Sequence, residues 1–280
     1  MRWKMVQAGA CLILVLGWSP TSAADAGVWI EDAGSGCALW IDHPHETVAT
    51  DWSGPCEDGK ASGRGVFTWR VLREGVEITE TYEGDFLAGR LAGEGLYKDT
   101  RGEVYEGSYL AGRKHGQGLH LLANGDRYDG EFKDGARHGK GRFDYANGDR
   151  YEGGFLAGKR QGQGVFEWLD GEIYEGEWID GVAQGEGRLT TAGGDLYVGQ
   201  WKAGRRHGEG VQTWRSGSRY QGSWEEDNMH GLGAMIWWNG ESFEGEFIND
   251  LGHGIGVCRT EEGAMAACEF TTGAFTRWVE

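Results

Sequence analysis

The stretch Tyr174-Glu175-Gly176-Glu177-Trp178 decides the fold of this chain, because its aromatic-x-Gly-x-aromatic pattern recurs along most of the sequence. An aromatic residue followed two positions later by Gly occurs eight times, always 23 residues apart. These eight residues are Tyr82, Tyr105, Tyr128, Tyr151, Tyr174, Tyr197, Tyr220 and Phe243. A constant period of this length identifies a repeat protein. Alternation of aromatic and charged residues is typical of a β-strand.

The glycines follow the same period. If the recurring aromatic residue is position 0 of each repeat, Gly stands at positions 2, 11, 13 and 20 in all eight repeats, which accounts for 32 of the 52 glycines. A second alternating stretch, such as Gly162-Gln163-Gly164-Val165-Phe166-Glu167-Trp168, fills positions 11 to 17. Each repeat is therefore predicted to be one β-hairpin. Gly on the aromatic face predicts a slot in which a ring from a neighbouring strand lies.

Two connections join the strands. The first carries Asn-Gly or Asp-Gly in four repeats, which favours a two-residue turn with positive φ at both residues. Its examples are Asn124-Gly125, Asn147-Gly148, Asp170-Gly171 and Asn239-Gly240. The second connection carries Gly at position 7 in six repeats, whereas Asp227 and Asp250 replace it in the last two. We expect those two turns to differ in shape from the others.

These patterns predict an all-β protein, an elongated single-sheet antiparallel meander of stacked hairpins with no helix beyond a short terminal piece. The sheet is expected to be one layer thick, so that its aromatic groove stays partly open. Candidate groove residues are six tryptophans of the repeats, namely Trp168, Trp178, Trp201, Trp214, Trp224 and Trp237.

The repeat resembles the MORN repeat family. Its pattern is present as Tyr105-Glu106-Gly107-Ser108-Tyr109 followed by His115-Gly116-Gln117-Gly118, and the resemblance covers residues 82–265 without a gap. We expect residues 52–81 to be a divergent MORN-like repeat, residues 25–51 an N-terminal capping segment, and residues 266–280 a truncated repeat with the C-terminal cap.

The first residues are typical of an export signal. Arg2 and Lys4 precede an apolar run from Met5 to Leu16, and Ser22-Ala23-Ala24 supplies small residues for cleavage. We therefore expect residues 1–24 to be a signal peptide and the protein to reach the periplasm or the exterior. The alternative is an uncleaved anchor, but about 12 apolar residues fall short of the ~20 that span a bilayer.

Removing the signal leaves four cysteines, an even set that suits an oxidising compartment. Two strands per repeat at ~4.8 Å each place the terminal repeats roughly 70–80 Å apart, whereas a disulfide needs Cα atoms within about 7 Å. This geometry favours Cys37 with Cys56 and Cys258 with Cys268 as caps at the two ends.

The composition argues against several classes of function. The formal net charge of −17 becomes −19 without Arg2 and Lys4, which disfavours nucleic acid as a partner. Acidic residues at positions 1 and 3 are expected on a solvated outer face. Histidines at position 10, and the pair His43 and His45, do not make a metal site, because neighbouring rungs are about 10 Å apart and two imidazoles lack a third ligand. We predict no catalytic residues, no metal and no cofactor.

Basic residues gather at positions 8 and 9. If the hairpins stack in register, these residues form a basic edge that binds an anionic polymer, a lipid headgroup row or an acidic partner; alternatively, they protect the edge and pair with acids. They are Arg90, Arg113, Lys114, Arg137, Lys159, Arg160, Arg205 and Arg206.

The sequence thus predicts an exported, non-catalytic scaffold that binds a protein partner or a second copy of itself. The alternative is peripheral binding to envelope lipid or anionic polysaccharide through the basic edge, which the resemblance supports because MORN repeats elsewhere are often linked to membranes and phosphoinositides. No membrane span is expected after signal cleavage. Some MORN proteins carry a lipid kinase or methyltransferase domain, for which the rest of this chain has no room.

Overall fold

The structure is a computed structural model that describes residues 27–42 and 46–279. The expected signal segment 1–24 lies outside the described residues, as do His43 and His45. The described residues form strands and turns, with no helix among them.

The described part of the chain contains 24 strands. Their bounds are β1 (Val28–Glu31), β2 (Ala38–Ile41), β3 (Glu46–Trp52), β4 (Cys56–Glu57), β5 (Lys60–Ala61), β6 (Gly63–Arg73), β7 (Val76–Leu87), β8 (Arg90–Asp99), β9 (Val104–Leu110), β10 (Arg113–Leu121), β11 (Arg127–Lys133), β12 (Ala136–Asp144), β13 (Arg150–Leu156), β14 (Lys159–Glu167), β15 (Ile173–Ile179), β16 (Val182–Thr190), β17 (Leu196–Lys202), β18 (Arg205–Thr213), β19 (Arg219–Glu225), β20 (Asn228–Ile236), β21 (Ser242–Ile248), β22 (Leu251–Arg259), β23 (Met265–Thr271) and β24 (Ala274–Trp278).

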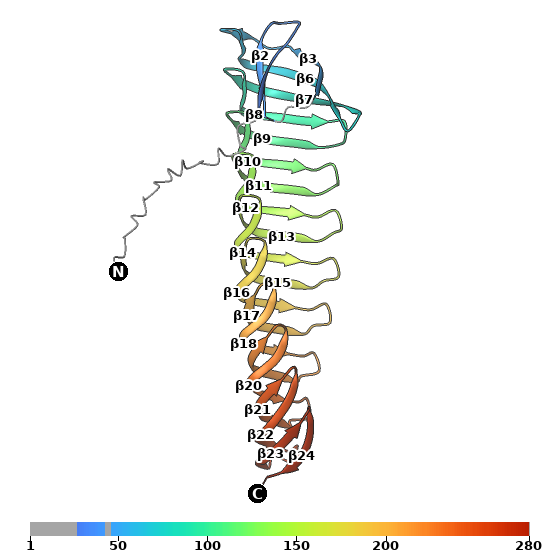
Figure 1. The fold of residues 1–280 in the computed structure, drawn as a ribbon, viewed down its shortest axis with the longest axis vertical. Helices are drawn as coiled ribbons and strands as arrows, with labels where there is room; N and C mark the ends of the chain where they lie inside the picture. The colour runs from blue at the N-terminus through green and yellow to red at the C-terminus, as the bar shows by residue number, and fades with distance from the viewer. Residues whose placement is uncertain (1–26, 43–45, 280) are drawn as a thin grey trace, which may run out of the picture.

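One antiparallel sheet runs the length of the molecule (Figure 1). It starts with β3, which pairs with β6, and from β6 to β24 each strand pairs with the next strand in the chain. No pairing between described residues joins β24 back to β3, so the sheet is open at both ends. The predicted single-sheet meander is confirmed.

The glycines make the slots that the sequence predicts. In β13 the ring of Tyr151 lies over Gly153 of its own strand and Gly164 of the paired strand β14. A Cβ atom at Gly164 would lie 2.6 Å from two ring carbons of Tyr151, a distance that real Cβ atoms do not show. The slot is what lets the ring lie flat against the sheet.

The hydroxyl of each position-0 tyrosine also donates a hydrogen bond to a backbone carbonyl of its own strand. The hydroxyl of Tyr151 donates a hydrogen bond of 3.0 Å to the carbonyl of Gly154, and Tyr128 donates to the carbonyls of Glu131 and His138 at 2.9 and 3.3 Å. Burial raises the pKa of Tyr128 to about 12, so its hydroxyl stays a donor at physiological pH. These carbonyls flank the register shift between Gly130 and Glu131, a β-bulge that bends the hairpin.

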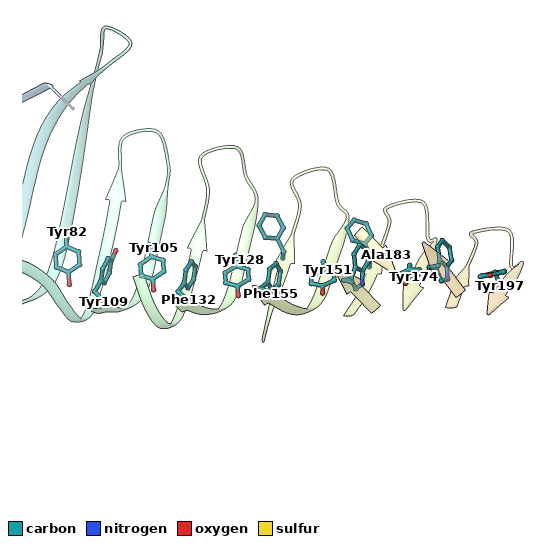
Figure 2. Close-up of a cluster of buried hydrophobic side chains, with 14 of the residues drawn as sticks. Tyr82, Tyr105, Tyr109, Tyr128, Phe132, Tyr151, Phe155, Tyr174, Ala183 and Tyr197 are labelled. Atoms are coloured by element: carbon teal, nitrogen blue, oxygen red, sulfur yellow. The ribbon is translucent and has the colours of Figure 1, made fainter. Parts of the chain in front are cut away.

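The rings form one continuous column (Figure 2). Tyr151 meets Phe155 of its own repeat and Trp178 of the next repeat edge to face, with ring centroids 5.2 and 5.4 Å apart. The same contacts recur along the repeats, as for Tyr174 with Trp178 and Trp201 at 5.2 and 5.0 Å. Edge-to-face contact is a favoured aromatic geometry, and here it links each repeat to the next.

The two connections differ from the sequence prediction. Asn124-Gly125 belongs to a three-residue loop, because Leu122 and Asp126 pair through the N–H of Leu122 and Gly125 alone has positive φ. The predicted two-residue turn is therefore wrong at this connection. A type I turn followed by a left-handed Gly needs no positive φ from Asn.

Two-residue turns with positive φ at both residues occur instead at positions 6 and 7. The prediction that the turns at Asp227 and Asp250 differ in shape is wrong: φ is 73° at Asp227 and 80° at the equivalent Gly204. Asp tolerates the left-handed region, and the Asp227 carboxylate accepts the N–H of Arg206 at 2.9 Å.

Both ends carry the predicted disulfides. Cys37 is bonded to Cys56 and Cys258 to Cys268, each with Cα atoms 5.8 Å apart. At the N-terminal end a small sheet of order β1-β2-β5-β4 lies beside the position-7 turns, and Trp40 donates its backbone N–H to the carbonyl of Gly89 at 2.8 Å.

Replacing Gly164 by Ala is expected to destabilise the protein by about 1–3 kcal/mol, because the new methyl group overpacks against the Tyr151 ring. Gly193→Ala is the matched control, since its added Cβ would meet only the Thr191 hydroxyl at 3.7 Å and its φ is not left-handed. Denaturant midpoints measure both variants. Equal denaturation midpoints for the two variants would contradict the close packing of the Tyr151 ring against Gly164.

Candidate functional site

The concave face of the sheet carries a groove in three parts, with volumes of about 530, 610 and 510 Å³ from the N-terminal to the C-terminal end. In the central part its floor is the ring column of positions 0 and 4, namely Tyr174, Trp178, Tyr197 and Trp201. Its walls come from positions 9, 15 and 17, whose side chains project beside the column.

The structure divides the six candidate tryptophans between floor and wall. Trp178, Trp201 and Trp224 occupy position 4 and are buried in the ring column. Trp168, Trp214 and Trp237 occupy position 17 and are half-buried along the wall, the first two in the central part of the groove and the third in the C-terminal part. The wall tryptophans are thus the ones that a ligand can reach.

The eight candidate basic residues fall into two rows, because successive side chains of a strand point to opposite faces. Position 9 points into the groove. There the guanidinium of Arg160 lies 4.1 Å from the Trp178 ring centroid and donates to the carbonyl of Gly181 at 2.6 Å. Arg137 likewise donates to the carbonyl of Gly158 at 3.1 Å, but its guanidinium lies closest to the Phe143 ring of its own repeat, at 4.5 Å. Burial lowers the pKa of Arg137.

Position 8 faces outward and pairs with acids of the next turn. Lys159 contacts Asp180 at 3.1 Å and Arg205 contacts Glu226 at 3.0 Å, all four side chains being more than half exposed. Near the N-terminal end Arg113 contacts Asp42 at 3.5 Å, whereas Arg90 stacks 4.1 Å from the Trp40 ring of β2. This outer row agrees with the alternative of edge protection. Its binding of an anion stays a prediction.

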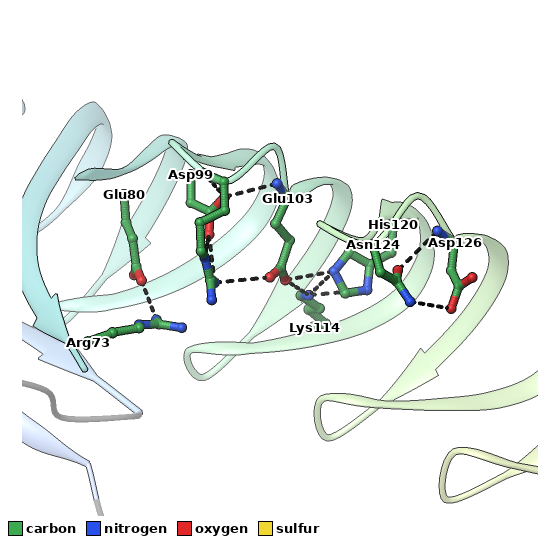
Figure 3. A network of polar contacts seen from close by, with 9 residues as sticks. Arg73, Glu80, Asp99, Glu103, Lys114, His120, Asn124 and Asp126 are labelled. Carbon is green, nitrogen blue, oxygen red and sulfur yellow. Dashed lines mark hydrogen bonds and ion pairs between the residues drawn. The ribbon is translucent and has the colours of Figure 1, made fainter. Parts of the chain in front are cut away.

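A polar cluster in the N-terminal part of the groove was not predicted from the sequence (Figure 3). Glu103 accepts a hydrogen bond of 2.8 Å from His120, which lies 3.0 Å from the Lys114 ammonium. The hydrogen bond from His120 is the main reason that the pKa of Glu103 falls to about 2. Desolvation lowers the pKa of Lys114 to about 8, against the opposing effect of Glu103. Only the stacking of positions 9, 15 and 21 brings these residues together.

The outer face is polar, as expected, over residues 117–175, whereas Val198, Leu232 and Ile255 expose apolar side chains on it toward the C-terminal end. Asp129, Glu131, Glu152 and Glu175 line a shallow hollow on it together with Lys140 and Arg142. No group of three or more metal-ligating side chains occurs in the part of the chain that the structure describes. The position-10 histidines lie in five different repeats beside the bulge, where His230 contacts Glu225 at 3.6 Å.

Comparison with known proteins agrees with the repeat pattern. A family model described as MORN repeat matches nine segments, residues 57–70, 82–104, 105–127, 128–150, 151–173, 174–196, 197–219, 220–242 and 243–265. The segment 57–70 falls in the divergent copy, where Trp52 fills the slot over Gly54 and Gly65. A search of curated proteins found no match.

The desolvated ammonium group of Lys114 predicts a pH dependence of stability. The unfolded chain, with a lysine pKa of about 10.4, binds more protons than the folded chain between pH 8 and 10.4, so the free energy of unfolding rises with pH in that window. Relative to Lys114→Met, wild type should gain on the order of 2–3 kcal/mol across it. Denaturation at a series of pH values measures the difference.

Lys133→Met is the control for this measurement, because the Lys133 side chain is exposed. A difference between wild type and Lys114→Met that stays flat from pH 7 to 10.5, like that of the control, would show that Lys114 is not desolvated.

Proposed function

Because the chain belongs to the MORN repeat family, whose repeats generally act as protein- or membrane-binding modules, we propose that it is an exported scaffold that binds a protein partner, or a second copy of itself, in its groove. The partner contacts the wall residues of positions 9, 15 and 17, while the ring column beneath them keeps the sheet rigid.

The central part of the groove is the observation that carries this proposal. About 610 Å³ of space is bordered by the half-buried indoles of Trp168 and Trp214, and by the arginines at 160 and 206. Tryptophan and arginine are the residues that dominate protein interfaces, since both combine large contact area with directional polar groups. An extended segment or a helix face fits an open trough of this kind.

A non-catalytic role is in keeping with the family, which is generally without catalytic activity. The basic residues at position 9 of the groove are paired with carboxylates or with turn carbonyls. Arg206, for example, contacts Asp227 at 3.3 Å and donates to the Asp227 carbonyl at 2.7 Å. We infer that these charges hold the groove in shape and take no part in a reaction.

Two observations support export. The disulfides at the two ends are compatible with an oxidising compartment, in the periplasm or outside the cell. The first residues carry the pattern of a cleaved signal. In residues 27–42 and 46–279 there is no helix with the length and apolar character of a membrane span.

The second candidate function is peripheral binding of lipid headgroups or anionic polysaccharide by the outer basic row. Lys159 and Arg205 favour it, being more than half exposed, but each is already paired with an acid. The formal net charge of −17 opposes approach to an anionic surface. Flotation with anionic vesicles at two salt concentrations tests this function, and absence from the lipid fraction at both excludes it.

A photoreactive amino acid placed at position 214 tests the groove as the binding face. We expect it to crosslink a single stoichiometric partner, or a second copy of the chain, in the native envelope. The same label at position 188 is the control, because Arg188 is exposed on the outer face. Equal crosslinking from both positions, or none from position 214 with a monomer in sedimentation, would contradict the proposal.

A further inference from the structure

Position 9 holds a long side chain in the groove of six repeats, and two repeats, with Ala183 and Gly252, break this rule. Along the eight repeats the residues at position 9 are Leu91, Lys114, Arg137, Arg160, Ala183, Arg206, Met229 and Gly252. Ala183 stands between two arginines, in the middle of the central part of the groove. The repeat 174–196 therefore lacks the cation that its neighbours on both sides possess.

The arginines of the neighbouring repeats show what such a cation does. Arg160 and Arg206 each lie over the position-4 indole of the following repeat, 4.1 Å from the Trp178 centroid and 4.5 Å from that of Trp224. Each also donates from Nη2 to the carbonyl at position 7 of that repeat, at 2.6 and 2.7 Å. The planar guanidinium satisfies both contacts at once, which an ammonium does not.

The equivalent groups for Ala183 lie in the following repeat, 197–219, and are present without their cation. The position-4 indole is Trp201, 8% exposed against 4% for Trp178 and 3% for Trp224. The position-7 carbonyl is that of Gly204, to which no side chain of the described residues donates. Both Trp201 and Gly204 line the 610 Å³ space.

We propose that this vacancy at Ala183 binds an arginine side chain of the partner protein. The guanidinium would lie against Trp201, donate to the carbonyl of Gly204, and sit flanked by the half-buried Trp168 and Trp214 of the adjoining repeats. The partner thus completes the row of arginines that the chain itself leaves incomplete. This inference rests on the proposed function, since it names the group that the groove recognises.

The charges around the vacancy are compatible with the binding of one more cation. Arg137 and Arg160 already occupy adjacent repeats, so one repeat of separation between guanidinium groups is tolerated. The carboxylates of Glu172, Asp195 and Asp227 line the same space, against the two cations Arg160 and Arg206. Desolvation, together with the nearby Asp170, raises the pKa of Glu172, as expected of a carboxylate that lacks a cation.

Filling the vacancy from within the chain tests whether the space accepts a guanidinium. Ala183→Arg restores the pattern of the neighbouring repeats and should raise the denaturation midpoint. Val182→Arg is the matched control: it adds the same charge one residue earlier, at an exposed outer position whose facing position-6 residue is Ala203. A midpoint for Ala183→Arg at or below that of Val182→Arg would overturn the proposal.

Binding is measured by titrating the full mature chain with N-acetyl-arginine amide and following the indole N–H signals by NMR. We expect saturable shifts of the Trp201, Trp168 and Trp214 signals. N-acetyl-citrulline amide, which has the same shape without the charge, should bind about tenfold more weakly, and Ala183→Arg should abolish the shifts that Val182→Arg retains.

Equal binding of the two probes, shifts elsewhere in the chain, or no shifts at all would each overturn the vacancy as an arginine site. The proposed function has a separate readout. If the label at position 214 crosslinks a partner and Ala183→Arg leaves that crosslink unchanged, the groove binds its partner without this pocket. If Ala183→Arg loses the crosslink and Val182→Arg keeps it, the result supports both the groove as the binding face and the arginine site at Ala183.

Discussion

The packing of a tyrosine ring into the slot of two glycines is the interaction on which the structure depends. Without side chains at Gly153 and Gly164, the Tyr151 ring lies flat on the sheet and its hydroxyl reaches the carbonyl of Gly154 beside the bulge. The bulge bends every hairpin in the same direction, and the sum of these bends is the groove. A sheet of this size with no second layer obtains its core in this way, from rings that meet edge to face from one end to the other.

Because the repeats stack at a constant period, residues at the same position of successive repeats form a row along the sheet. Each repeat contacts its two neighbours, so the stability of the array is a sum of similar interfaces and the ends are its weakest points. The disulfides stand at those ends. The row of two-residue turns adds hydrogen bonds between repeats, such as that from the N–H of Gly181 to the carbonyl of Arg160 at 2.9 Å.

The division between constant and variable positions explains how one framework recognises a particular partner. The framework glycines and an aromatic ring at position 0 recur in every repeat, because a larger side chain in a slot would expel the ring. Positions 9, 15 and 17 carry no such constraint, and they range from Arg and Trp to Ala and Gly. The groove is therefore a string of distinct subsites on a uniform floor, and its specificity comes from the order of the residues along its walls.

Periodicity alone determined the hairpins, their order, the glycine slots and both disulfides, because 23-residue phasing makes the environment of one repeat the environment of all. Periodicity did not determine the shapes of the turns. Asn124-Gly125 belongs to a three-residue loop and not to the two-residue turn that this dipeptide favours, and Asp227 adopts the same positive φ as the glycines it replaces. From periodicity alone, Lys159 and Arg160 were predicted to lie together in one basic edge. Only the three-dimensional structure separated them, since adjacent side chains of a strand point to opposite faces and the bulge fixes which of the two enters the groove.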